Sequence, residues 1–286
     1  MKLGHGLVHK LCKESMSNQS KTIGLLGCGW LGYPLALSLK ANNFVVNGST
    51  TQDSKALKLS EAGINPFIIR FGENELRLKE FLEVDILILG LPPSLKGRGE
   101  IYQDVLKGLG SLISKLDDLK ILFVSSTGVY GENQGLVDEF TLPRPNSKRG
   151  ENLLMAEEEV KSWVKKTTIL RFGGLVGGSR HPVFSLNRKR GKKIGNGPIN
   201  LIHQDDCMGI IKAIIEIESW GELYNGVSPY HPSKDEYYTN VCDFFNLPRL
   251  QFLESEAGKK VEGVNLEQKL NYKFVHPELR PNLFTP

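Results

Sequence analysis

Short apolar runs alternate with segments of helical periodicity over residues 21–172, which is the pattern of repeated βαβ units. We predict strands at Thr22–Leu26, Phe44–Asn47, Pro66–Arg70, Asp85–Leu91, Lys120–Ser125 and Thr168–Phe172. The helices predicted between them are Leu31–Lys40, Ser54–Ala62, Leu76–Leu82, Ile101–Leu116 and Gly150–Lys165. This alternation predicts the α/β class, with a doubly wound parallel sheet.

The alternation weakens after residue 172, where glycine-rich and basic segments follow. We therefore expect a first domain over residues 21–172 and mainly a smaller substrate lobe over residues 173–286. A further apolar helical pattern and a short strand pattern place residues 199–227 back in the main sheet.

The first twenty residues differ in pattern from the rest of the chain. Residues 1–20 lack the apolar core of a signal peptide, and we expect them to form a flexible extension. A second methionine precedes the first strand, so the start of translation stays open between Met1 and Met16.

Composition and charge argue against a membrane-spanning protein and against a nucleic-acid partner, but they do not indicate a function. The chain is 40% hydrophobic and 24% charged, as in soluble globular proteins, and its apolar runs are too short to span a bilayer. The net charge of +4 is mild and the basic run Arg188–Lys193 is interpreted as a solvated loop, so neither nucleic acid nor a membrane is expected as a partner. The four cysteines show no metal-ligand spacing; we expect no metal site, and their scatter fits a reducing cytoplasm.

A glycine turn follows the first predicted strand and opens the first helix, with the sequence Gly27-Cys28-Gly29-Trp30-Leu31-Gly32. Gly27 permits a tight turn, Gly29 leaves room for a pyrophosphate, and Gly32 allows the helix to approach the strand. The positive end of the helix would then face the diphosphate. The turn predicts a Rossmann domain that binds NAD(H) or NADP(H).

The end of the second strand bears on the choice between these cofactors. NAD-preferring sites usually place an acidic residue here, whereas this chain has Ser49 and Thr50, with Lys55 a turn later. Hydroxyls and a cation suit a 2′-phosphate, so we expect a preference for NADP(H). Asp53 is close enough in sequence to keep NAD(H) open.

Several segments together resemble the extended short-chain dehydrogenase/reductases, the NAD-dependent epimerase/dehydratase family. Val124–Gly131 resembles the family's fifth strand and active-site turn, and Ile202–Asp206 resembles its His-x-x-Asp segment. The glycine turn resembles the family's motif with Leu26 in place of the first glycine. The resemblance covers the chain from Lys21 onward and is closest to an uncharacterised branch, so it implies the fold and supplies no substrate.

The resemblance also implies where catalytic residues should lie. Family members move a hydride at a sugar carbon with a serine or threonine and a Tyr-x-x-x-Lys pair. Counted back from Glu157, the tyrosine position falls on Arg149 and the lysine position on Leu153; a register moved by one residue gives Gly150 and Leu154. The usual base and its activating lysine are therefore expected to be missing.

Besides Lys148, just before the predicted helix Gly150–Lys165, three polar residues remain as catalytic candidates. Ser126 matches the family's serine position, Tyr130 follows it in the turn, and His181 titrates near neutral pH after the glycine-rich loop. We expect an NAD(P)-dependent oxidoreductase or epimerase with a non-standard acid/base residue, acting on a small polar substrate such as a nucleotide sugar. The expected cofactor-binding residues are Gly27, Gly29, Trp30, Leu31, Gly32, Ser49, Thr50, Pro92 and Ser125.

Two other functions stay open. The loss of both catalytic residues would also fit a regulatory or scaffold protein that binds the dinucleotide without turning it over. A nucleic-acid partner for the basic run has little support, because no recognition motif accompanies it. A homodimer is compatible with each of these functions.

Three more polar residues are expected to be structural. Arg171 ends a buried strand and is expected to pair with a carboxylate, although it could reach a substrate phosphate. His203 and Asp206 are expected to join the second lobe to the first, with Asp206 capping the next helix.

Overall fold

The computed structural model describes residues 20–73, 75–91, 99–116, 118–188, 193–254 and 258–285. Pro92, Met16 and most of the basic run Arg188–Lys193 lie outside these ranges, so the expectations placed on them are not addressed below. None of the helices in the described ranges has the length and apolar character needed to cross a membrane.

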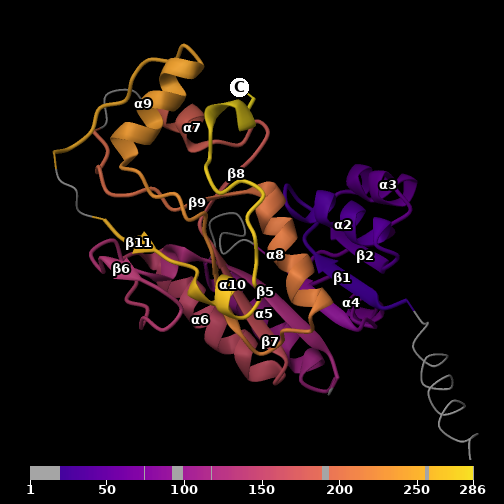
Figure 1. Ribbon diagram of the computed structural model, residues 1–286. Helices are drawn as coiled ribbons and strands as arrows, with labels where there is room; N and C mark the ends of the chain where they lie inside the picture. Colours follow the sequence, from indigo (N-terminus) through magenta and orange to yellow (C-terminus); the bar gives the residue numbers. More distant parts are fainter. Residues whose placement is uncertain are drawn as a thin grey trace, which may run out of the picture.

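A seven-stranded sheet forms the centre of the molecule, with the strand order β10-β7-β5-β4-β1-β2-β3 (Figure 1). The strands are β1 (Thr22–Leu26), β2 (Val45–Thr50), β3 (Asn65–Ile68), β4 (Ile86–Leu89), β5 (Lys120–Ser126), β7 (Thr167–Phe172) and β10 (Leu223–Gly226). Every pairing is parallel, and the order reverses between β1 and β4. The fold is therefore the doubly wound Rossmann-like sheet that the sequence predicts, with its switch point beside the glycine turn.

Strand β2 is longer than its predicted range Phe44–Asn47. It continues to Thr50, which pairs with Ile68 of β3, because β3 extends the ladder beyond Gly48, where the pairing with β1 ends. The hydroxyl residues expected beyond the strand thus belong to its carboxyl end.

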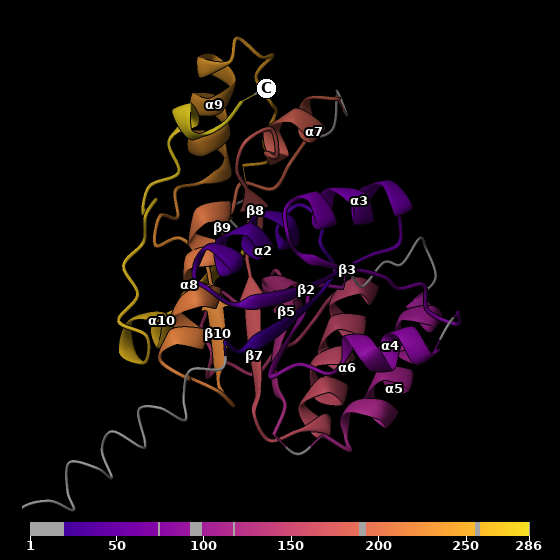
Figure 2. The ribbon, with the colours of Figure 1, turned by 90° about the vertical axis from the view of Figure 1, so that its right-hand side faces the viewer.

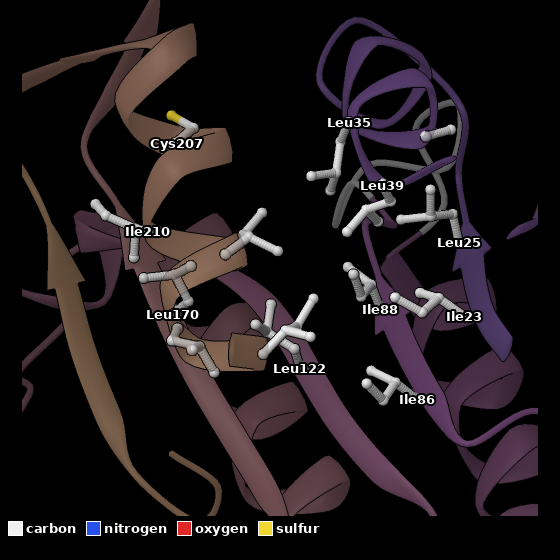
Figure 3. Packing of buried hydrophobic residues seen from close by; sticks show 14 of the residues in the cluster. Ile23, Leu25, Leu35, Leu39, Ile86, Ile88, Leu122, Leu170, Cys207 and Ile210 are labelled. Atoms are coloured by element: carbon white, nitrogen blue, oxygen red, sulfur yellow. The ribbon is translucent and has the colours of Figure 1, made fainter. Parts of the chain in front are cut away.

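Helices cover both faces of the sheet (Figure 2). One face carries α2 (Gly32–Ala41), α3 (Asp53–Glu61) and α8 (Gln204–Glu216), and the other carries α4 (Glu75–Phe81), α5 (Gly99–Ile113) and α6 (Lys148–Trp163). On the first face, Leu35 and Leu39 of α2 and Ile210 of α8 pack with aliphatic side chains of the central strands (Figure 3). Because both faces are covered, the central strands are apolar almost throughout, which is why their sequence shows continuous rather than alternating hydrophobicity.

A smaller lobe lies beyond the carboxyl end of β7. It contains α7 (Pro182–Arg188), α9 (Lys234–Phe244) and a two-stranded sheet of β8 (Gly174–Val176) and β9 (Leu201–His203). Its core includes Val183, Tyr237 and Phe284. Helix α8 and strand β10 follow β9 and return the chain to the main sheet.

Buried Glu139 fixes the edge of the sheet to the C-terminal part of the chain. Its carboxylate accepts hydrogen bonds from the backbone N–H groups of Asn225 in β10 (2.9 Å), Val264 (3.0 Å) and Asn265 (3.3 Å). The last two residues begin α10 (Val264–Gln268). Burial raises the pKa of Glu139, and these three donors act in the opposite direction.

Candidate functional site

The glycine turn brings the end of β1 against the start of α2. Gly27 has φ of +117°, a conformation that favours glycine, and a Cβ on Gly32 would lie 2.2 Å from the carbonyl oxygen of Gly27. A Cβ on Gly29 would meet nothing within 4 Å. Gly27 and Gly32 therefore serve the close approach of helix and strand, whereas Gly29 borders open space.

Ser49 supports this turn from β2. Its hydroxyl accepts a hydrogen bond from the Gly27 N–H (2.9 Å), and its carbonyl accepts one from the Cys28 N–H (2.9 Å). Ser49 is 3% exposed, so its side chain holds the turn in place and is not offered to a ligand. Thr50 is half-buried, and its hydroxyl accepts a hydrogen bond from the Gln52 N–H (3.2 Å).

A cavity of about 550 Å³ opens above the glycine turn, at the carboxyl ends of β1, β4, β5 and β7. Its size is that of a small-molecule or cofactor site, and its position is the usual one in an open α/β sheet. Among the expected residues, it is lined by Gly27, Gly29, Trp30, Leu31, Gly32, Ser125 and Ser126. A second hollow of about 520 Å³ is lined by the residues that follow β3 and by α5, and it shares none of its lining residues with this cavity.

The lining of the cavity is mostly apolar, with few polar side chains. Among the described lining residues, Arg149 and Arg180 are the ionisable ones, and Ser125 and Ser126 supply hydroxyls. No carboxylate, histidine or tyrosine of the described ranges joins them. The cavity is thus suited to an anionic ligand and contains no side chain that ordinarily exchanges a proton near neutral pH.

Helix α6 contributes Arg149 and Leu153, the two positions at which the family resemblance places tyrosine and lysine. Ser147 caps the helix by accepting a hydrogen bond from the Gly150 N–H (3.2 Å). A Cβ on Gly150 would lie 2.5 Å from the carbonyl oxygen of Gly128, so the first turn of α6 packs directly on the turn after β5. This close packing brings Arg149 to the cavity beside Ser126.

Two contacts join the second lobe to the glycine turn. The Arg180 guanidinium lies 4.8 Å from the centre of the Trp30 ring, and its Nε donates to the Leu175 carbonyl (3.2 Å). The Gln204 side chain donates to the Trp30 carbonyl at 2.6 Å. Sequence reasoning missed Arg180 and Gln204, because their proximity to the turn arises only from the tertiary fold.

A buried polar network begins at Ser125 of β5. Ser125 donates to Oε1 of Glu157 (2.6 Å), and Glu157 forms an ion pair with Arg171 at 2.6 Å, with both charged side chains at most 3% exposed. The pairing expected for Arg171 is therefore confirmed, and Glu157 is its partner. Arg171 also donates to the Tyr130 hydroxyl (2.8 Å).

Tyr130 belongs to this network and not to the cavity. It is fully buried, and its hydroxyl donates to the Asp138 carbonyl (2.7 Å). Burial raises the pKa of Tyr130, although nearby Arg171 acts against that effect. Tyr130 therefore lies among buried polar partners and is not among the residues that line the cavity.

His181 also lies away from the cavity. Its Nε2 is 3.0 Å from the Tyr237 hydroxyl, its Nδ1 accepts from the Val183 N–H (3.2 Å), and its ring stacks 4.5 Å from Phe284. Both ring nitrogens are engaged within the core of the small lobe. His181 therefore packs within the small lobe and is not among the residues that line the cavity.

The environment of His181 predicts a specific pH dependence of stability. Burial lowers the pKa of His181 from 6.5 to about 4, so between these values the unfolded chain binds a proton that the folded protein does not. The free energy of unfolding should therefore fall as the pH drops from 6.5 to 4, with this residue contributing up to about 3 kcal/mol of the loss. Urea unfolding at several pH values should show a shallower dependence in His181→Asn, which keeps an acceptor for the Val183 N–H. An unchanged slope would contradict this assignment.

Comparison with known proteins gives both a relative and structural neighbours. No family model matches the chain. It is 33% identical over 276 residues to protein YeeZ of Escherichia coli strain K12, covering 90% of this chain and 97% of that protein.

Two solved structures illustrate the likeness in fold. A protein of Methylobacillus flagellatus assigned to the NAD-dependent epimerases/dehydratases has a TM-score of 0.72 at 25% identity, covering 91% of this chain and 94% of its own. UDP-glucuronic acid 4-epimerase of Bacillus cereus, in complex with UDP-glucuronic acid and NAD, has a TM-score of 0.69 at 20% identity, covering 88% and 93%. The structural neighbours are thus members of the short-chain dehydrogenase/reductase superfamily.

Proposed function

The chain belongs to the family of the Escherichia coli protein YeeZ, and we propose that it binds a nicotinamide dinucleotide and uses it to oxidise, reduce or epimerise a small polar substrate. The observation that carries the proposal is the open space over Gly29 at the amino end of α2, inside a cavity of about 550 Å³. Neighbours of the same fold, such as the epimerase of Bacillus cereus, bind NAD.

The diphosphate of the cofactor fits the glycine turn on chemical grounds. Among the residues of the described ranges, no acceptor meets the backbone N–H groups of Trp30 and Leu31. These groups lie at the positive end of α2, where an anion is stabilised. Arg180, stacked on Trp30, would add a cation from the second lobe.

Arg149 and Ser126 are the side chains best placed to hold the reacting part of the substrate. A bound dinucleotide would supply or accept a hydride. Ser126 accepts a hydrogen bond from the Gly128 N–H (3.2 Å), which leaves its own proton free to point at a substrate oxygen. The guanidinium of Arg149 is a hydrogen-bond donor without an acceptor, so it can stabilise an oxyanion on the substrate. We propose that this pair replaces the missing tyrosine and lysine, with water as the proton source.

We also propose that the protein prefers NADP(H). The residues that support this preference differ in part from those expected from the sequence. The Arg70 side chain donates to the Thr51 carbonyl (3.2 Å) and pairs with Asp53 at 3.2 Å, so a cation lies at the end of β2. An arginine in this place accommodates a 2′-phosphate, and Asp53 is engaged by it. The preference for NADP(H) is therefore based on Thr50 and Arg70, and no longer on Ser49.

A nucleotide sugar is the substrate class that fits the remaining features. The two arginines of the cavity suit the negative charge of a diphosphate or sugar acid. The related fold in Bacillus cereus holds UDP-glucuronic acid together with NAD. The substrate would enter between the main sheet and the small lobe.

Titration with NADH and NADPH tests the binding step. Trp30 lies in the turn, so its fluorescence should change on binding, and NADPH should bind more tightly than NADH. Arg180→Ala should weaken ADP binding about tenfold and leave adenosine binding unchanged, since the lost charge faces the diphosphate. Arg188→Ala removes a cation beyond the cavity lining and serves as the control. Failure of the unmodified protein to bind either dinucleotide would end the proposal.

A dinucleotide-binding protein without catalysis is the second candidate. It is favoured by the lining of the cavity, which among described residues offers no ordinary acid or base. Cofactor oxidation measured across a panel of sugar nucleotides separates the two. Turnover that drops at least about tenfold in Ser126→Ala would establish the enzyme, and tight binding without turnover would favour the binding protein.

A further inference from the structure

Three potential metal ligands from separate parts of the chain meet at the start of α8. They are His203 at the end of β9, Asp205 in the first turn of α8, and His276 in the C-terminal segment. His276 Nε2 lies 2.9 Å and His203 Nδ1 lies 3.4 Å from Oδ2 of Asp205, and the ligand atoms of all three lie within 4.8 Å of one another. Sequence spacing gives no sign of this cluster, because His276 is remote in the chain.

Asp206 fixes this convergence. It is fully buried, and its carboxylate accepts hydrogen bonds from the N–H groups of Val275 (2.7 Å) and His276 (3.1 Å). The Tyr272 hydroxyl donates to the same carboxylate at 3.0 Å. The segment that carries His276 is therefore held against α8 whether or not an ion is bound, and the cluster is organised in advance.

The charge of the cluster favours a cation. Asp205 and Asp206 place two carboxylates in the first turn of α8, beside the two histidines. His203 Nδ1 also accepts the Asp205 N–H at 3.2 Å, a long hydrogen bond that a metal would replace.

We propose that His203, Asp205 and His276 bind a divalent transition metal such as Zn²⁺. Donor atoms around a tetrahedral zinc, with bonds of about 2.0–2.1 Å, are separated by roughly 3.3 Å, close to the two shorter distances found here. The Asp205 side chain is 48% exposed and that of His276 is 20% exposed, so water can complete the coordination. Two imidazoles and one carboxylate suit zinc better than magnesium or calcium, which prefer oxygen ligands.

The ion would link the C-terminal segment to the start of α8, which contacts the glycine turn. Gln204 lies between two of the ligands in sequence, and its side chain donates to the Trp30 carbonyl. The site is separate from the cavity, whose lining includes none of the three ligands. The inference therefore does not depend on the proposed function.

Calorimetric titration of the metal-free full chain with Zn²⁺ alone tests the site. We expect one ion to bind in the micromolar range or tighter, and Co²⁺ to give the visible absorption of a tetrahedral site. Asp205→Asn and His276→Gln should each lose this binding and the accompanying rise in Tm. His231→Gln removes a histidine that contacts the Ile199 carbonyl elsewhere, and should bind Zn²⁺ as the unmodified protein does.

Asp205→Asn and His276→Gln are chosen so that a loss of Zn²⁺ binding can be distinguished from a loss of folding. Both replacements are close in size to the original side chains, and their folding is checked by circular dichroism and by Tm without metal. A further variant combines Asp205→Asn with His276→Gln. Zn²⁺ binding that survives in this double variant would come from other residues, such as His5, His9 and Cys12, and would overturn the proposal. Absence of binding to the unmodified protein would overturn it as well.

Discussion

Replacing Arg171 by methionine is expected to destabilise the protein by about 3–5 kcal/mol, because Glu157 would be left charged and buried without its partner. The side chains of Glu157 and Arg171 are 1% and 3% exposed, and two guanidinium nitrogens contact the carboxylate at 2.9 Å and 2.6 Å. After the change, the Ser125 hydroxyl would be the one donor to the carboxylate that remains among the described residues. Urea unfolding followed by circular dichroism gives the free energy directly.

The double variant Arg171→Met with Glu157→Leu provides the control for this prediction. Exchanging a buried ion pair for apolar side chains of similar size is often nearly neutral, so most of the lost stability should return. Tyr130 would keep the Asp138 carbonyl as its partner. If the two single effects simply added in the double variant, the ion pair would not be the source of the loss.

Gly29→Ala is expected to abolish dinucleotide binding while leaving stability nearly unchanged. A Cβ on Gly29 meets no atom of the described residues within 4 Å, but it would occupy the space proposed for the diphosphate. Gly32→Ala should instead destabilise the fold, by about 1–3 kcal/mol, because its Cβ would lie 2.2 Å from a backbone oxygen. Titration with NADPH and thermal unfolding separate the two effects.

Gly108 supplies the matched control. It lies within α5, and a Cβ there also meets nothing within 4 Å, but it is remote from the cavity. Gly108→Ala should keep both binding and stability, with a small gain from helix propensity. A Gly29→Ala protein that binds NADPH normally would show that the diphosphate does not approach this turn.

The sequence predicted the sheet well because its strands are buried on both faces. Continuous apolar runs such as Asp85–Leu91 have few alternatives to a covered parallel strand, and the glycine turn marks the first βα junction. Arg149 and Leu153, two positions counted from Glu157 in the sequence, both line the cavity. A local sequence pattern is sufficient for features that a single strand, turn or helix determines.

The surroundings of the catalytic candidates depend on tertiary packing, which a local sequence pattern does not show. His181 and Tyr130 follow the expected strands in sequence, but their rings turn into separate cores and their polar atoms are engaged there. Whether a side chain faces a cavity or a core depends on elements far away, such as Tyr237 of α9 and Asn225 of β10. The cluster of His203 and His276 escaped notice for the same reason.

The position of Glu139 has a consequence for the biosynthesis of the protein. Its three backbone donors lie at residues 225, 264 and 265, so a nascent chain that has passed residue 139 carries this carboxylate for a long time without partners. Until β10 has emerged from the ribosome, β7 is also an unpaired edge of the sheet. Folding is therefore completed only when most of the chain has been translated, and chaperones have an exposed strand to protect in the meantime.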